Sequence, residues 1–252
     1  GSGKSVTARI VLGLLQRSRS VRVSGLVEFE GRDLGSLPER ERARLRGTRM
    51  SMIFQDPTSS LNPVYTVEAQ FHEVLRRGQP DIGRGEARAC AEKALAEVSI
   101  PEPGRVLESY SFQLSGGMNQ RVMIAMALAN EPSLLLADEP GTALDVTVQA
   151  QTLGLMRRLV EEHNTSVLFI SHNLGVVREF ADRVYVIYKG RIVEHGTADG
   201  LFADPRHPYT RALMRAVPRI TGGGIPEIED VSDDYFAPFV VHEGCGEPEE
   251  AE

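Results

Sequence analysis

The 252-residue chain has only two cysteines and contains no apolar run near the roughly 20 residues that a membrane-spanning helix needs. Any membrane role is therefore expected to go through a partner. Cys90 and Cys245 lie far apart and lack metal-ligand spacing, and such sparse cysteine is typical of a reducing cytoplasm. No secretory signal peptide is recognisable, although the sequence begins inside a motif, which leaves its upstream context open.

Lysine and arginine are absent from residues 220–252, where ten acidic residues gather. The whole chain has a net charge of −7, so the remainder without these ten acids carries +3. An acidic segment containing glycine and proline is typical of a solvated, poorly ordered extension. The acidic overall charge also argues against general nucleic-acid binding, and no nucleic-acid partner is predicted.

Short, continuously apolar runs at 50–54, 133–138 and 166–171 predict buried parallel strands. Alternation or helical spacing predicts β-structure at 21–30, 184–188 and 191–194, and helices at 6–15, 37–46, 64–77, 85–98, 114–129, 147–163 and 208–216. Strands alternating with helices indicate an α/β domain with a mainly parallel sheet. The predicted domains are a core of 1–56 and 131–200, an inserted helical subdomain at 57–130, and a C-terminal extension with an acidic tail at 201–252.

The chain opens on Gly1-Ser2-Gly3-Lys4-Ser5, which matches the second half of the pattern G-x-x-x-x-G-K-[ST]. Such a loop directs backbone N–H groups, a lysine and a helix N-terminus at nucleotide phosphates, while Ser5 would ligate Mg²⁺. The first glycine of the pattern and its preceding strand are not in the sequence, so we interpret the chain as truncated within this motif and expect weakened nucleotide affinity. Taken alone, the five residues are also compatible with a leader left by cloning.

Two predicted strands end in residues suited to phosphate chemistry. Asp138 and Glu139 follow the run at 134–137, and His172 follows the run at 167–171. Because ligands of open α/β sheets bind at the carboxyl ends of the strands, Asp138 is expected to hold Mg²⁺, Glu139 to act as general base, and His172 to contact the γ-phosphate. Gln55, at the end of the strand at 50–54, is expected to touch the Mg²⁺ and water. Taken singly, each could be an ordinary solvated surface residue.

A further motif identifies the combination. Residues 114–121 read Leu-Ser-Gly-Gly-Met-Asn-Gln-Arg, a glycine turn that opens a helix. This segment resembles the signature motif of ATP-binding cassette (ABC) ATPases, the run ending at Asp138-Glu139 resembles their Walker B motif, and Ala143-Leu144-Asp145 resembles their D-loop. With Gln55 as Q-loop and His172 as switch histidine, the motifs occur in the family's order across about residues 1–200. The resemblance implies the P-loop NTPase (RecA-like) fold.

Additional segments are similar to the oligopeptide/dipeptide (and nickel) importer branch of that family. They are Phe-Gln-Asp-Pro at 54–57, Ser-Leu-Asn-Pro at 60–63, the helix at 121–128, residues 143–151, and His-Pro-Tyr-Thr-Arg-Ala-Leu at 207–213. The match indicates the branch and leaves the cargo open between dipeptides, oligopeptides, nickel and others.

The resemblance implies a head-to-tail dimer, homomeric or heteromeric, that buries two ATP molecules with Mg²⁺. Ser115, Gly116 and Gly117 of one subunit, with Gln120 and Asp145, would face the ATP held by Lys4 and Ser5 of the other. A groove near Gln55 would dock a coupling helix of a transmembrane permease. The protein would sit at the cytoplasmic face of the membrane and work indirectly with an extracytoplasmic substrate-binding protein.

Three departures from the family pattern stand out. Gly141 replaces a usual threonine after Glu-Pro, and Asn119 replaces a frequent basic residue in the signature. The tail lacks a cysteine-rich run, so no iron–sulfur site is predicted. The aromatic residue that stacks on adenine in the family would lie upstream of residue 1.

Two alternatives to a transport ATPase remain. A soluble ABC ATPase of translation or DNA maintenance usually has two cassettes or long coiled coils, whereas Lys4 and Ser115 are 111 positions apart here with no heptads between them. An inactive fragment or non-catalytic assembly module is favoured by the incomplete phosphate loop and opposed by the presence of Glu139 and His172.

Overall fold

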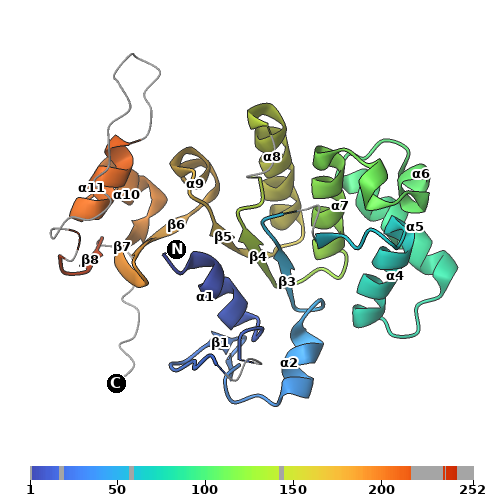
Figure 1. The fold of residues 1–252 in the computed structure, drawn as a ribbon, viewed down its shortest axis with the longest axis horizontal. Coiled ribbons are helices and arrows are strands. Elements are labelled where there is room, and N and C mark those ends of the chain that lie inside the picture. The colour runs from blue at the N-terminus through green and yellow to red at the C-terminus, as the bar shows by residue number, and fades with distance from the viewer. Residues whose placement is uncertain are drawn as a thin grey trace. The chain divides into compact units, whose positions relative to one another are not determined.

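The computed structural model describes residues 2–16, 20–56, 60–141, 145–216, 235 and 237–242 (Figure 1). The chain divides into two compact units. The large unit comprises Ala8–Ile170, and the terminal unit combines Gly1–Thr7 with Ser171–Glu252. The domain boundaries predicted from the sequence differ from this division and stay predictions.

The large unit contains a parallel sheet and a run of helices. Its elements are the end of α1 (Lys4–Val11), β1 (Glu28–Phe29), β2 (Arg32–Asp33), α2 (Glu39–Leu45), β3 (Met50–Ile53), α4 (Val67–Gly78), α5 (Arg84–Glu97), α6 (Pro103–Glu108), the 3-10 turn η1 (Ser111–Gln113), α7 (Gly116–Leu128), β4 (Leu134–Asp138), α8 (Val146–Glu162) and β5 (Ser166–Ile170).

The parallel sheet has the strand order β3-β4-β5, as the three apolar runs predict. Strand β4 lies in the middle, and its Leu135, Leu136 and Ala137 have no exposed surface, because both faces of a central parallel strand are covered. Ile53 pairs with Ala137, and Asp138 with Ile170. The register therefore brings the ends of β3 and β4, which carry Gln55 and Glu139, to one edge of the sheet.

The β-structure expected at 21–30 is largely wrong. Only Glu28–Phe29 forms a strand there, paired antiparallel with Arg32–Asp33. Neither strand pairs with another strand within the described residues. An isolated two-stranded hairpin is only marginally stable, which accounts for the shortness of both strands. The stretch nevertheless packs on the core, since the partly buried Val27 and Phe29 lie against the cluster of Ala8, Leu12, Leu34, Met50, Leu136 and Ile170.

The helical segment is organised around α7. Nine residues of α7 are buried, namely Asn119, Gln120 and Val122–Leu128. A helix buried over so much of its surface is expected to be apolar on nearly all sides, as α7 is. Its neighbours α4 and α5 each bury one stripe, including Phe71 in α4 and Leu95 in α5. The sequence correctly predicts both of these helices but does not predict the short helix α6.

The terminal unit contains α9 (Leu174–Phe180), β6 (Arg183–Tyr188), β7 (Arg191–Thr197), α10 (Ala198–Ala203), α11 (Pro208–Arg215) and β8 (Val240–Val241). Strands β6 and β7 form an antiparallel hairpin as expected, and its turn residues Lys189 and Gly190 both have positive φ, at 44° and 81°. None of the described helices in the chain is both long and apolar enough to cross a bilayer.

The acidic segment is not wholly a solvated extension. Its Val240 and Val241 form β8, which pairs parallel to Glu194 and His195 of β7. His242, in the next position, is 5% exposed and packs closely over Gly196, where a Cβ atom would lie 3.0 Å from the His242 side chain. The apolar run from Ala237 to Val241 allows this part of the tail to pair with the sheet, which an average over the acidic composition conceals.

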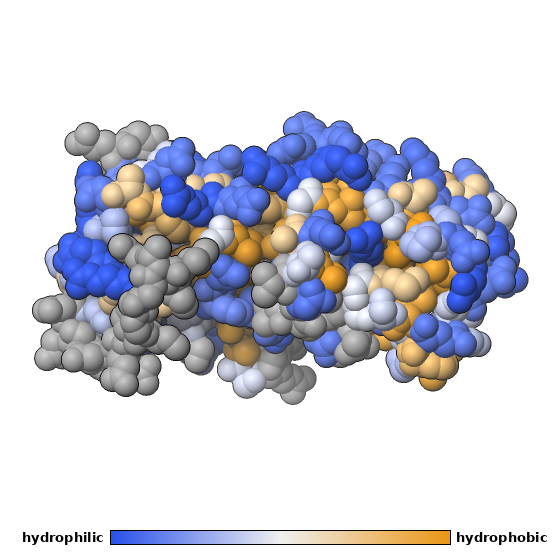
Figure 2. Space-filling view, turned by 90° about the horizontal axis from the view of Figure 1, so that it is seen from above, coloured by the Kyte–Doolittle hydropathy of each residue, from blue (hydrophilic) through white to orange (hydrophobic). Residues whose placement is uncertain are grey.

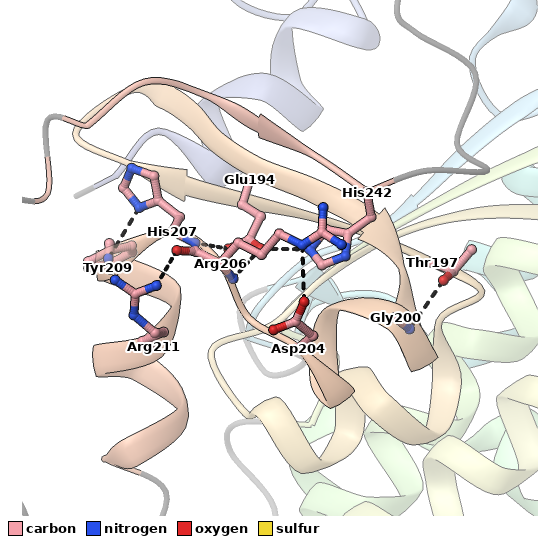
Figure 3. Close-up of polar contacts among 9 residues, drawn as sticks. All are labelled: Glu194, Thr197, Gly200, Asp204, Arg206, His207, Tyr209, Arg211 and His242. Carbon is pink, nitrogen blue, oxygen red and sulfur yellow. Dashed lines mark hydrogen bonds and ion pairs between the residues drawn. The ribbon is translucent and has the colours of Figure 1, made fainter.

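A fully buried carboxylate joins the tail to the rest of the terminal unit (Figure 3). Glu194 has no exposed surface, and its side chain accepts hydrogen bonds from the backbone N–H groups of Arg206 (2.8 Å) and His207 (3.1 Å). His242 Nε2 lies 2.7 Å from Glu194 Oε1, so this nitrogen must carry the proton. Burial alone would raise the pKa of Glu194, but the nearby Thr210 hydroxyl, the two backbone N–H groups and His242 together lower that pKa below its ordinary value.

We expect Glu194→Gln to destabilise the terminal unit by about 3 kcal/mol, because an amide presents an N–H group where the carboxylate accepts buried donors. Since the folded-state pKa of Glu194 is lowered, its contribution is present above the ordinary carboxyl value of 4.5 and is lost as the pH falls below it. Urea unfolding between pH 3.5 and 7 measures both effects. Asp204→Asn is the control, since this exposed partner of Arg206 should change stability by less than about 1 kcal/mol.

Candidate functional site

The carboxyl edge of the parallel sheet holds the predicted acid pair. Asp138, at the end of β4, is 2% exposed, and Glu139 follows it with a φ of +50°. The Glu139 backbone N–H donates to Ile170 O at 2.9 Å, which continues the pairing with β5 by one residue. The backbone of Glu139 is therefore hydrogen-bonded to the sheet, so its side chain does not project from a free loop.

The structure brings Gln55 to the same carboxylate. The Gln55 amide nitrogen donates to Glu139 Oε2 at 3.2 Å, across 84 positions of sequence. With its N–H engaged there, the amide oxygen of Gln55 remains the group suited to a cation. Asp138 and Gln55 thus present oxygen donors beside the expected general base, and oxygen is the ligand type that Mg²⁺ prefers. Their assignment to Mg²⁺, together with Ser5, stays a prediction.

The turn after Glu139 is held from inside the large unit. Gly141 N–H donates to Glu139 O at 2.7 Å, and both Pro140 and Gly141 are buried. Gln120, in α7, is 1% exposed, and its Nε2 donates to Pro140 O at 2.8 Å. Sequence reasoning places Gln120 among the nucleotide contacts and misses this internal bond, because no local pattern reveals which way a helical glutamine points. A nucleotide contact by Gln120 stays a prediction.

Gly141, the departure from the family's usual threonine, lies against α8. A Cβ atom at this position would lie 2.8 Å from Gln149 Cγ, so a side chain here would displace that glutamine. Thr142 and the D-loop residues Ala143 and Leu144 lie outside the described residues. Asp145 begins the helix α8, where its Oδ1 accepts the Val148 N–H at 2.9 Å as an N-cap. This capping role comes in addition to the nucleotide contact predicted for Asp145.

The signature turn forms the N-terminus of α7. The exposed Ser115 is the N-cap, and its hydroxyl accepts the Met118 N–H at 3.2 Å. Gly116 opens the helix, and a Cβ atom on Gly117 would lie 3.1 Å from Val148 Cγ1, so Gly117 permits close packing on α8. The exposed N–H groups of this helix end form a site of positive potential, as binding to a phosphate anion requires. Asn119 points inward and donates to Ser111 O at 3.0 Å.

The phosphate-loop residues belong to the terminal unit, and Gly1 lies outside the described residues. Helix α1 begins at Lys4, directly after Gly3, whose φ of +100° suits glycine. Gly3 O accepts the Thr7 N–H at 3.0 Å, while Ser2 O accepts the Gly190 N–H at 3.0 Å. Lys4 Nζ donates to Ser2 Oγ at 3.1 Å. Lys4 and Ser5 therefore occupy the first turn of a helix, as the phosphate-loop interpretation predicts.

His172 also belongs to the terminal unit and is exposed. It lies between Ser171, whose hydroxyl accepts the Asn173 N–H at 3.0 Å, and Asn173, whose Oδ1 caps α9 by accepting from Gly175 and Val176. These three hydrogen bonds define the backbone on either side of the histidine. Its predicted contact with a γ-phosphate stays a prediction.

Two protein families match the chain. The family described as "ABC transporter" matches residues 1–142, and "Oligopeptide/dipeptide transporter, C-terminal region" matches residues 193–246. The second match includes most of β7 together with α11 and β8, so Glu194, His207 and His242 lie within that C-terminal region.

Individual proteins agree with these matches. The peptidoglycan transport ATP-binding protein YejF of Agrobacterium fabrum is 52% identical over 92% of this chain, which spans 42% of that protein. The oligopeptide transport ATP-binding protein AppD of Bacillus subtilis is 45% identical over 97% of this chain, which spans 74% of that protein. A dimeric ATP-binding cassette solved in a post-hydrolysis state with ADP and Pi is 28% identical, with a TM-score of 0.68 over 78% of this chain and 81% of that one.

These matches confirm the predicted P-loop NTPase fold, since the similar structures are ABC cassettes. They also confirm the resemblance drawn from the signature, Walker B and C-terminal segments. Whether the phosphate loop is truncated stays a prediction. With its strand-end acid pair, its signature helix and its C-terminal region, the chain belongs to the ABC transporter family.

Proposed function

We propose that this chain is the ATP-binding and ATP-hydrolysing subunit of an importer for di- or oligopeptides. The observation that carries the proposal is the contact of Gln55 with Glu139 beside Asp138, at the carboxyl edge of a parallel sheet. The residues proposed as base and cation ligands lie at the edge of the sheet where α/β proteins commonly bind nucleotides, which supports the proposal. The match to the C-terminal region of oligopeptide/dipeptide transporters supports the peptide class.

In the proposed reaction, Lys4 and the N-terminus of α1 bind the β- and γ-phosphates of ATP. Glu139 accepts a proton from the attacking water, whose oxygen forms the new bond to the γ-phosphorus. The bond from the γ-phosphorus to its bridging oxygen breaks, and ADP leaves with that electron pair. Mg²⁺, held by Ser5, Asp138 and Gln55, would offset the phosphate charge, while His172 hydrogen-bonds the γ-phosphate.

The signature turn has its proposed role in a second subunit. Ser115, Gly116 and Gly117 would meet the γ-phosphate held by the partner, so two ATP molecules would close a head-to-tail dimer. The exposed N-terminus of α7 supports this role, because its unpaired N–H groups would otherwise face water. The dimeric state of a similar cassette bound to ADP and Pi is consistent with it. Gln120 and Asp145 are proposed as further contacts.

An exposed apolar surface in the large unit supports contact with a permease. Phe54 (40% exposed) adjoins Gln55 in the chain, Val64 (70%) and Tyr65 (56%) precede α4, and Phe112 (71%) lies in η1. A bridge between Thr66 and Tyr110 brings the start of α4 near η1. Figure 2 shows hydrophobic residues at the surface in several places, some of them in the right-hand third of the view, the side on which Figure 1 draws α4 to α6. Through such a contact the chain would sit at the cytoplasmic face of the membrane and serve an extracytoplasmic binding protein indirectly.

We expect Val64→Asp to weaken binding to the permease at least about tenfold, because it adds a charge to an apolar contact that must lose its water. Co-purification with a peptide-importer permease measures the effect. Leu26→Asp is the matched control, since Leu26 is 64% exposed in the same unit but lies away from the Gln55 segment in the sequence. Equal permease recovery for both variants would contradict the assignment of this surface.

The proposal as a whole is tested by peptide uptake into vesicles that contain the permease and this chain. Uptake that needs ATP, the permease and the chain together is the expected result. ATP hydrolysis that no permease binds or stimulates would favour a soluble ABC ATPase. Absence of both ATP binding and hydrolysis would favour an inactive fragment. The names of the relatives include peptidoglycan and oligopeptide transport, so muropeptides and oligopeptides are the cargoes to compare first.

A further inference from the structure

The turn that carries Glu139 has a backbone conformation that must be held in place. Glu139 has a φ of +50°, in the left-handed region that non-glycine residues seldom occupy, and the next two residues, Pro140 and Gly141, are buried. Such a conformation persists only where surrounding contacts maintain it. One contact lies inside the turn, from Gly141 N–H to Glu139 O at 2.7 Å, and another comes from β5, where Ile170 O accepts from Glu139 N–H at 2.9 Å.

The third contact comes from the signature helix. Gln120 Nε2 donates to Pro140 O at 2.8 Å, in surroundings where the glutamine is 1% exposed. A buried carbonyl requires a donor, and Gln120 supplies one to the residue directly after Glu139. Gln120 lies only five positions after Ser115, the N-cap of the same helix. One rigid helix thus joins the signature turn to the turn of the acid pair.

Two glutamines from opposite ends of the helical segment consequently bond to the turn, Gln55 at Glu139 and Gln120 at Pro140. Gln55, which precedes that segment, donates to the carboxylate, whereas Gln120, near its end, bonds to the backbone. We propose that Gln120 is a positioning residue for hydrolysis, which holds the Glu139–Gly141 turn so that the carboxylate faces the attacking water. The inference rests on the proposed function and gives the signature helix a second task within its own subunit.

The test compares two variants that each lose one buried side-chain bond to a proline carbonyl. Gln120→Met keeps the side-chain length and removes the donor to Pro140 O. Thr165→Val is the matched control, because Thr165 Oγ1 donates to Pro132 O at 2.9 Å at the other end of β4. For both variants, single-turnover hydrolysis and ATP affinity are measured on the full chain with its dimer partner. Thermal unfolding verifies that both variants are folded.

We expect Gln120→Met to slow the hydrolytic step about 10- to 100-fold, because a general base displaced by even 1 Å loses much of its effect. Because Pro140 O already accepts from Gln120 Nε2 in this structure, ATP affinity should stay within about threefold of the unmodified chain, whereas a direct nucleotide contact by Gln120 would make the variant lower it. Thr165→Val should hydrolyse normally. Gln120→Glu supplies a further readout. When protonated it can donate to Pro140 O, so its rate relative to the unmodified chain should rise as the pH falls from 8 to 6.

Amide hydrogen exchange tests the same inference without turnover. Gly141 N–H should exchange faster in Gln120→Met than in Thr165→Val, whether or not the chain hydrolyses ATP. Unchanged exchange at Gly141, or a lowered ATP affinity with an unchanged hydrolytic rate, would overturn the positioning role. If the unmodified chain binds no ATP, the proposed function fails separately, and the exchange measurement still decides the role of Gln120.

Discussion

Replacing Glu139 with glutamine is expected to slow ATP hydrolysis about 10²- to 10⁴-fold while leaving ATP binding in place. The amide keeps the shape of the side chain and its proximity to Gln55, whose amide nitrogen lies 3.2 Å from Glu139 Oε2. It cannot take a proton from water at neutral pH. ATP would therefore remain bound, and a dimer closed by ATP would persist.

Size-exclusion chromatography with light scattering measures that dimer, and phosphate release measures turnover. Glu131→Gln is the matched control, because Glu131 shares the left-handed backbone of Glu139, with φ of 48° and 50°. It precedes β4 on an exposed loop, whereas Glu139 follows the same strand. Hydrolysis at the unmodified rate by Glu139→Gln would show that another group is the base.

Replacing Lys4 with alanine should weaken ATP binding about 100-fold, an effect on binding rather than on turnover of bound ATP. A charge-assisted hydrogen bond to phosphate contributes about 1.5–3 kcal/mol, and about 1.4 kcal/mol corresponds to a factor of ten in affinity. Lys4 is partly buried in the first turn of α1, and within the terminal unit its Nζ contacts the Ser2 hydroxyl at 3.1 Å.

Isothermal titration with a non-hydrolysable ATP analogue measures the loss for Lys4→Ala. Lys93→Ala removes an equal charge from the surface of α5, where the side chain is 80% exposed, and should bind the analogue normally. Equal affinities for the two variants would show that Lys4 does not bind the phosphates. Titration of a chain extended upstream through the complete loop pattern tests separately whether residues before Gly1 change the affinity.

Much of the fold follows from local patterns. The helices α4, α5, α7, α8 and α11 and the strands β3, β4 and β5 lie within a few residues of their predicted ranges, because apolar spacing and glycine turns act over short distances. Local patterns do not predict the structure of the stretch at 21–30 or of the tail at 237–242, because the pairing of a short strand depends on contacts outside its own sequence. The adjacent β7 edge makes β8 a strand.

The motifs alone were sufficient to indicate the family, the parallel sheet and the residues around the acid pair, because each motif is a contiguous run whose chemistry can be read directly. Three contacts came only from the tertiary structure: Gln55 with Glu139, Gln120 with Pro140, and His242 with Glu194, separated by 84, 20 and 48 positions. Burial and side-chain direction decide such contacts. Both depend on how elements pack rather than on the residues next to each other in the chain.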